Sequence, residues 1–431
     1  CHQRGIAVLQ DVVYNHYDGN AERAEWQYDS TKPEENIYYW YEGRSADYAN
    51  PDRGYLDNGS TGYTPRFWEE RVRQVFISSA AEFVAEFHVD GLRVDLTQAI
   101  HRDNALHWTK PGDSNVCVGS ANLFGQKFLR EWSRTLRFIR PSVMLVAEDH
   151  TGWDAVTKMP NVGGLGFDAT WFAEFYHQLI GDSDMAGGKA RLLHEAGFGY
   201  DSELRIDEFA GQLWNTQFNK ISYHESHDEA GNAKGSLRTS KVAVNNAALI
   251  GSTRTYSEAR SRVAFGLSLL SAGTPMFFMG EEIVAQKQIK YDNTATSKEN
   301  LIGDRMGDGA KMFRFYQDLI RLRRSNPAAR SRSIDILHAW NPTRVLAFTR
   351  RHGHTDLLIV ASLNNQSFDD GYILQTDPHR LPAGLWQETF NSDAAIYGGH
   401  NIGNYGAAIP SDNGRLQLRL PANGFLVLQR C

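Results

Sequence analysis

The feature of this 431-residue chain that most constrains its fold is a repeated alternation between short apolar runs and longer amphipathic patterns. Apolar residues at i, i+3, i+4 and i+7 predict helices near residues 68–87, 125–139 and 311–323. Short apolar runs, typical of strands covered on both faces, lie at 6–13, 89–96, 143–147, 166–171, 221–224 and 274–279. Strands that alternate with helices predict a parallel α/β fold, either a doubly wound sheet or a β/α barrel.

The pattern changes after about residue 330. Short β-like runs with turn residues between them lie at 345–348, 357–363, 416–420 and 425–428. We therefore predict an α/β domain at 1–330 and an antiparallel β-sandwich domain at 331–431. Two domains also suit the length, because one hydrophobic core stops growing beyond roughly 250–300 residues. Residues 17–63 are polar and aromatic with little periodicity, and we expect a functional inserted loop there.

Composition narrows the possible partners. A formal net charge of -6 gives no reason to expect nucleic acid or an anionic membrane. No apolar run reaches the roughly 18 residues of a membrane-spanning helix, and the first residues do not resemble a signal peptide, so we predict a cytoplasmic protein. Cys1, Cys117 and Cys431 are odd in number and far apart, which argues against a disulfide framework or a structural zinc site.

Polar residues follow four of the predicted strands at or just after their C-terminal ends. They are Asp11, Asn15 and His16; Arg93 and Asp95; Glu148 and Asp149; and His227 and Asp228. Catalytic groups of a β/α barrel come from the C-terminal ends of several strands. One such Asp alone is more often a helix cap or a structural ion pair, by roughly two to one. The histidines lack any metal-binding pattern such as HExxH, and no metal is predicted.

Charged side chains in buried strands need oppositely charged or hydrogen-bonding partners, and these residues could be partners for one another. Arg93 could pair with Asp11 or Asp95 and hold a carboxylate ionised. Breaking a glycosidic bond with retention needs two carboxyl groups about 5–5.5 Å apart, one ionised and one protonated. A third carboxylate is suited to stabilising the oxocarbenium-like transition state. His16 and His227 could donate hydrogen bonds to sugar hydroxyls.

Four segments resemble, in order, the signature segments of the α-amylase superfamily, glycoside hydrolase family 13. They are DVVYNH at 11–16, GLRVDLTQAI at 91–100, VAEDH at 146–150 and SHDE at 226–229. Each lies on or beside a predicted strand, and the resemblance extends over most of the chain. It implies a (β/α)8-type TIM barrel in which the segment around Asp11 is the third strand. The first two strands would then precede Cys1, so we expect a barrel that is truncated at its N-terminus.

The resemblance also implies a role for each matching residue. Asp95 would be the nucleophile, Glu148 the acid/base, and Asp228 the group that stabilises the transition state. Arg93 would keep Asp95 ionised, and Asn15 would support the adjoining loop. The substrate-binding residues would be Asp11, His16, Arg93 and His227. The implied partner is an α-1,4-glucan such as glycogen, starch or a maltooligosaccharide, with no cofactor.

Within this superfamily, three features resemble the 1,4-α-glucan branching enzymes, which transfer α-1,4 chains to form α-1,6 branches. These are SHDE itself, EDHTGWDAVT followed by GGLGFDATW, and WQETFNSDAAIYGGHNIGN at 386–404. The segment YDNTATSKENLIGDRM at 291–306 departs from the branching pattern, and HESHDEAGN resembles trehalose-releasing hydrolases of the maltooligosyltrehalose trehalohydrolase type. We predict branching, with an α-glucan hydrolase or a catalytically silent glucan-binding protein as alternatives.

Overall fold

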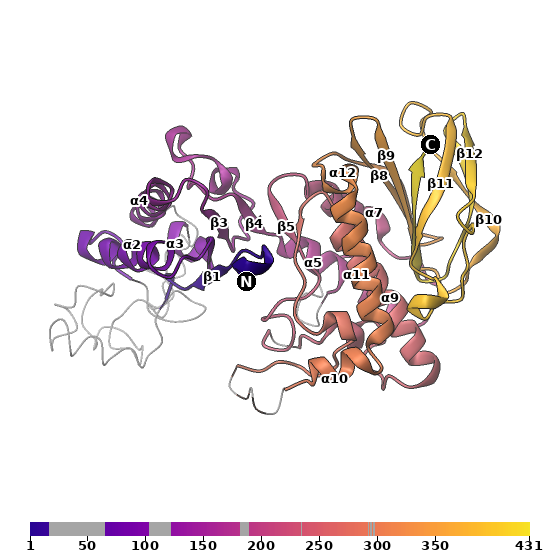
Figure 1. Ribbon diagram of the computed structural model, residues 1–431, viewed down its shortest axis with the longest axis horizontal. Helices are drawn as coiled ribbons and strands as arrows, with labels where there is room; N and C mark the ends of the chain where they lie inside the picture. Colours follow the sequence, from indigo (N-terminus) through magenta and orange to yellow (C-terminus); the bar gives the residue numbers. More distant parts are fainter. Residues whose placement is uncertain are drawn as a thin grey trace, which may run out of the picture. The chain divides into compact units, whose positions relative to one another are not determined.

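The computed structural model describes residues 1–16, 65–102, 122–181, 189–233, 235–291, 293, 295 and 298–431. They form two compact units, which we call the first unit (Cys1–Trp171) and the second unit (Phe172–Cys431) (Figure 1). The predicted loop at 17–63 and Cys117 lie outside the described residues. No helix of the described part is both long enough and apolar enough to cross a membrane.

The first unit contains four parallel strands that are neighbours in chain order. They are β1 (Leu9–Val12), β2 (Gly91–Val94), β3 (Met144–Ala147) and β4 (Ala169–Trp171). The helices among its described residues are η1 (His2–Arg4), α2 (Glu70–Ala85), α3 (Thr97–His101), α4 (Leu123–Ile139), η6 (Asp154–Thr157) and η7 (Pro160–Val162). The strands and the two amphipathic helices predicted for this stretch are confirmed.

Helices α2 and α4 bury their apolar faces in a core with the strands of the first unit. At its centre the Tyr14 ring lies 5.2 Å from Phe76 and, edge-on, 5.8 Å from Phe128. Asn122 caps α4 by accepting a hydrogen bond from the backbone N–H of Gly125 at 2.9 Å. A Cβ on Gly125 would lie 1.7 Å from the carbonyl oxygen of Ile100, so this approach of α4 to α3 requires glycine.

The second unit begins with a helical part and two parallel strands, β5 (Lys220–Ser222) and β6 (Thr274–Pro275). Its helices include α9 (Gly251–Leu270), which is largely buried, and α11 (Ala310–Ser325), which confirms the helix predicted at 311–323. The others are α5 (Ala173–Leu179), α6 (Leu192–Gly197), α7 (Ile206–Asn215), α8 (Thr239–Val242), η8 (Glu281–Ile283), α10 (Leu301–Met306), α12 (Pro327–Arg330) and η9 (Ala395–Tyr397).

An antiparallel eight-stranded sheet completes the second unit, in the order β10-β13-β12-β11-β14-β9-β8-β7. Figure 1 labels β8 to β12 of this sheet. The strands are β7 (Ile334–Trp340), β8 (Val345–His352), β9 (Thr355–Ser362), β10 (Phe368–Gln375), β11 (Gly384–Asn391), β12 (Ala408–Asp412), β13 (Arg415–Leu420) and β14 (Gly424–Arg430). The predicted fold class, parallel α/β followed by antiparallel β, is confirmed. The boundary at 330/331 stays a prediction.

The segment 386–404 has a structural task in this unit. Its Phe390 and Tyr397 rings stack at 5.6 Å, and both contact Phe315 of α11. The Tyr397 hydroxyl donates to Asp318 at 3.0 Å, and the buried Arg262 of α9 donates to the Tyr397 carbonyl at 3.0 Å. The segment therefore fastens the β-sheet to α9 and α11.

Candidate active site

Parallel pairing brings the polar residues of β1, β2 and β3 to one end of the first unit. Asp11 of β1 lies beside Arg93 of β2 in the register. The ladder continues past both strands: the N–H of Asp95 donates to the Val12 carbonyl at 3.0 Å, and the N–H of Glu148 to the Val94 carbonyl at 2.9 Å. Asp95 and Glu148 therefore leave the sheet at the same edge.

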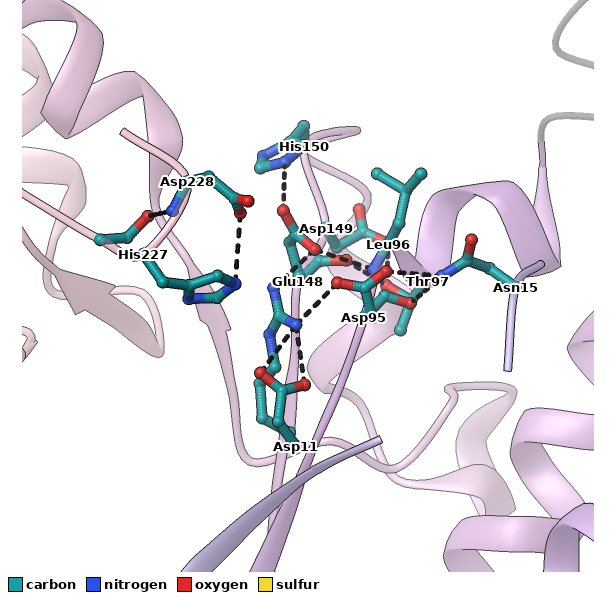
Figure 2. Close-up of polar contacts among 12 residues, drawn as sticks. Asp11, Asn15, Asp95, Leu96, Thr97, Glu148, Asp149, His150, His227 and Asp228 are labelled. Atoms are coloured by element: carbon teal, nitrogen blue, oxygen red, sulfur yellow. Dashed lines mark hydrogen bonds and ion pairs between the residues drawn. The ribbon is translucent and has the colours of Figure 1, made fainter. Parts of the chain in front are cut away.

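One guanidinium group connects three carboxylates at this edge (Figure 2). Arg93, only 5% exposed, donates from Nη1 to Asp11 at 2.8 Å and to Asp95 at 2.7 Å, and from Nη2 to Glu148 at 2.7 Å. Its Cζ lies 4.2 Å from the centre of the Trp171 ring, a cation–π contact. Burial lowers the pKa of Arg93, but the charges of Glu148, Asp11 and Asp95 outweigh it and the pKa is raised. Arg93 thus contacts both Asp11 and Asp95, the two acids with which the sequence analysis expected it to pair.

Asp95 is oriented from its other side by Asn15. The Asn15 amide, which is fully buried, donates to Asp95 Oδ2 at 2.8 Å and to the Asp95 carbonyl at 3.0 Å. His16 Nδ1 is hydrogen-bonded to the Asn15 side-chain oxygen. Burial and the charge of Glu148 raise the pKa of Asp95, although Arg93 and Asn15 act in the opposite direction.

Glu148 is held by three protein groups and is less exposed than Asp95 (12% against 20% of the side chain). Its Oε2 accepts from Arg93 and from the backbone N–H of Leu96 at 2.9 Å, and its Oε1 lies 3.3 Å from His150 Nε2. Burial raises its pKa, but His150, Arg93 and the Leu96 N–H together lower it. Leu96 has φ 37°, a conformation that is costly for a branched residue and that aims this N–H at the carboxylate.

This order of pKa values is the reverse of what the predicted roles require, since a nucleophile must be ionised and an acid protonated. The two carboxyl groups bind neighbouring nitrogens of one guanidinium, so they titrate as a pair rather than singly. Before any sugar is bound, burial and the charge of Glu148 thus raise the pKa of Asp95, whereas the contacts of Glu148 lower its own pKa.

A second group of residues, not predicted as site residues, holds the backbone beside Glu148. Asp149, which is buried, accepts hydrogen bonds from Thr97 at 2.8 Å and from the backbone N–H of Thr151 at 3.0 Å, and pairs with His101 Nε2 at 2.6 Å. Thr97 also donates to the Glu148 carbonyl at 2.7 Å. The only sequence signal was Asp149 itself, because Thr97 and His101 lie about fifty residues away.

The remaining predicted residues, His227 and Asp228, belong to the second unit and follow β5. His227 Nε2 lies 3.5 Å from Asp228 Oδ2, and the Asp228 N–H donates to the Ser226 hydroxyl at 3.2 Å. The structure therefore groups Asp11, Asn15, His16, Arg93, Asp95 and Glu148 in the first unit, and His227 and Asp228 in the second. Among the described residues, no set of three or more His, Cys, Asp and Glu side chains is arranged to hold a metal.

Arg93→Met is expected to destabilise the protein by about 3 kcal/mol at pH 7, because it leaves the carboxylates at this edge unpaired. The loss should shrink as the pH falls, since protonated carboxyl groups no longer repel one another. Urea unfolding at pH 7 and pH 4.5 measures both effects. Arg254→Met is the matched control: Arg254 also pairs with two acids, but Asp308 is highly exposed, so we expect a loss of about 1 kcal/mol or less. Equal losses for the two variants would contradict this account of Arg93.

Comparison with known families covers nearly the whole chain. The model of the alpha amylase catalytic domain matches residues 1–307, and that of the alpha amylase C-terminal all-beta domain matches residues 338–431. Curated relatives include 1,4-alpha-glucan branching enzymes from Xanthomonas campestris (28% identical, 99% of this chain and 55% of the relative) and Cupriavidus necator (29% identical, 100% and 53%). The chain thus spans about half the length of these relatives.

Solved structures share the fold at low sequence identity. The debranching enzyme of Nostoc punctiforme is 18% identical with a TM-score of 0.65, over 99% of this chain and 76% of that one. The α-amylase of H. orenii is 19% identical with a TM-score of 0.63, over 100% and 81%. Since the catalytic-domain model matches well over half of the residues, this chain belongs to the α-amylase family, glycoside hydrolase family 13.

Proposed function

We propose that this chain acts on α-1,4-glucans with retention, through a covalent glycosyl-enzyme intermediate. The observation that carries the proposal is the placement of Asp95 and Glu148 on the two terminal nitrogens of Arg93. Retention requires a nucleophilic carboxylate and an acid/base carboxyl group close together on one side of the domain. Asp95 is the proposed nucleophile, Glu148 the acid/base, and Asp228 the stabiliser of the transition state.

The proposed reaction has two displacement steps. In the first, an Asp95 oxygen attacks the anomeric carbon while Glu148 gives its proton to the departing glycosidic oxygen, which leaves as a sugar hydroxyl. In the second, the Glu148 carboxylate takes a proton from the incoming hydroxyl as that oxygen replaces Asp95 at the anomeric carbon. Arg93 remains charged throughout and holds Asp95 in place.

The first step requires Glu148 to be protonated, although the contacts of its carboxylate lower its pKa. His150, whose side chain is one-third exposed, supplies part of the stabilisation of ionised Glu148. A glycosidic oxygen that takes the place of His150 at Glu148 Oε1 would remove that contribution and favour the protonated acid. Arg93 and Asn15 would meanwhile stabilise the charge on Asp95.

The dependence of kcat/KM on pH is expected to be bell-shaped, because only the singly protonated pair is active. Activity falls at low pH when the second proton binds, and at high pH when the last proton leaves. Since one pKa of the pair is lowered and the other is raised, the alkaline limb should lie above the usual Asp value of 3.8. Initial rates on amylose across pH 3–10 test this. An alkaline limb that persists unchanged in Glu148→Gln would contradict the assignment.

Within this chemistry, branching is the reaction we favour, namely transfer of an α-1,4 chain to a 6-hydroxyl. Curated relatives over nearly the full chain are named as branching enzymes. Hydrolysis is the second candidate, because the segment at 291–306 departs from the branching pattern. The predicted cytoplasmic location stays a prediction, as does the role of the loop at 17–63.

Incubation of the purified protein with amylose distinguishes the candidates. Loss of iodine colour with new α-1,6 linkages and few new reducing ends, read by NMR and a reducing-sugar assay, supports branching. A rise in reducing ends without α-1,6 linkages supports hydrolysis. Retained glucan binding with no change in the polymer would mean that the chain is a silent glucan-binding protein and that the proposed chemistry is wrong.

A further inference from the structure

The carboxylate of Asp228 is held by a tyrosine that the sequence did not single out (Figure 2 shows Asp228 beside His227). The hydroxyl of Tyr291 donates to Asp228 Oδ1 at 2.6 Å, a short hydrogen bond of the charge-assisted kind. The other oxygen, Oδ2, lies 3.5 Å from His227 Nε2. Tyr291 and His227 therefore divide the two oxygens of this carboxylate between them.

The backbone around Tyr291 is tied to the loop that carries His227 and Asp228. The Tyr291 N–H donates to the side-chain oxygen of Asn232 at 2.9 Å, and the Asn232 amide donates to the His227 carbonyl at 2.6 Å. The Asn232 N–H closes the ring by donating to the Asp228 carbonyl at 2.9 Å. These bonds hold the Tyr291 backbone close to the Asp228 backbone, so the Tyr291 hydroxyl can reach the Asp228 carboxylate.

The Tyr291 ring remains accessible although its hydroxyl is engaged. The residue is 57% exposed, and its ring centre lies 6.0 Å from that of His227 at an angle of 44°. An exposed aromatic ring with its polar end bonded to a carboxylate suits a ligand that has an apolar face and a rim of hydroxyls. A glucosyl unit has both: its C–H face can stack on the ring while a hydroxyl reaches Asp228.

We propose that Tyr291 is a positioning residue for Asp228 and that its ring forms part of the glucosyl subsite at that carboxylate. The inference rests on the proposed role of Asp228. By binding Oδ1, the tyrosine fixes the rotation of the carboxylate, and Oδ2, which lies 3.5 Å from His227 Nε2, keeps a lone pair that can accept from a sugar hydroxyl. The segment from residue 291 onward, which departs from the branching pattern, thus contributes a residue to the site. The difference between this segment and the branching pattern therefore affects which glucosyl unit binds at Asp228.

Tyr291→Phe and Tyr291→Ala separate the two parts of this proposal. Tyr291→Phe keeps the ring and is expected to lower kcat on maltoheptaose roughly tenfold with KM nearly unchanged, because one hydrogen bond to a charged group is lost. Tyr291→Ala is expected to lower kcat similarly and also to raise KM several-fold. The matched control is Tyr405→Phe, because Tyr405 is also exposed (74%) but precedes β12 and is not one of the proposed site residues. We expect it to leave both constants unchanged.

Asp228→Asn and the double variant Asp228→Asn/Tyr291→Phe complete the test. If Tyr291 acts through Asp228, adding Tyr291→Phe to Asp228→Asn should cause no further loss of kcat. Wild-type rates for Tyr291→Phe beside a strongly impaired Asp228→Asn would overturn the proposal for Tyr291 while leaving the proposed function intact. Wild-type rates for Asp228→Asn would instead show that the proposed function is wrong. Equal and additive losses in both backgrounds would also overturn the positioning role.

Discussion

Asp95→Asn is expected to lower kcat on amylose by at least about 10⁴-fold, because an amide cannot form the glycosyl ester that the proposed mechanism requires. Binding of maltoheptaose should persist, since the amide keeps the shape of the side chain and one acceptor oxygen. Initial rates and isothermal titration measure the two effects. Asp370→Asn, an exposed change on β10, is the matched control and should leave the rate unchanged.

Asp95→Asn is expected to lower the activity of the protein without lowering its stability. A raised pKa means that the folded protein disfavours the ionised carboxylate, so Asp95 lowers the free energy of unfolding at neutral pH. Replacing it with a neutral amide of the same shape should therefore leave the melting temperature unchanged or raise it. A lower melting temperature would contradict this account of the charge at Asp95, whatever the effect of the variant on the rate.

Glu148→Gln is expected to lower turnover of amylose by about 10²–10⁴-fold, the usual contribution of a general acid. The first step on α-glucosyl fluoride should be largely spared, because fluoride leaves without a proton. Steady-state and burst kinetics on the two substrates make the comparison. Equal losses on both would mean that Glu148 is not the acid, and Glu69→Gln at the N-terminus of α2 serves as the control change.

Glu148→Gln, unlike Asp95→Asn, is expected to lower the free energy of unfolding. The lowered pKa of Glu148 contributes stability that is present above the usual Glu value of 4.5 and is lost as the pH falls toward the lowered value. Glu148→Gln should therefore unfold at a lower urea concentration than wild type at pH 7, with the difference shrinking in acid. The pair of variants thus tests the charge distribution of the site independently of the reaction.

Local pattern was sufficient to predict most of the framework. The amphipathic spacing of α2, α4 and α11 and the apolar runs of β1 to β5 are properties of neighbouring residues, so they are readable in one dimension. The run at 274–279 is an exception: only Thr274–Pro275 form β6, and Met279 is half exposed. An apolar run by itself does not show where strand pairing ends.

The sequence by itself determined which acids lie at strand ends and in what order, because parallel strands that alternate with helices end at the same edge. Only the tertiary structure decided which of them share Arg93, that the pKa of Glu148 is lowered while that of Asp95 is raised, and that Tyr291 reaches Asp228 from 63 residues away. The physical reason is the distance along the chain between the residues that interact. Periodicity depends on neighbours along the chain, whereas hydrogen bonds and burial, which set pKa values, depend on neighbours in space.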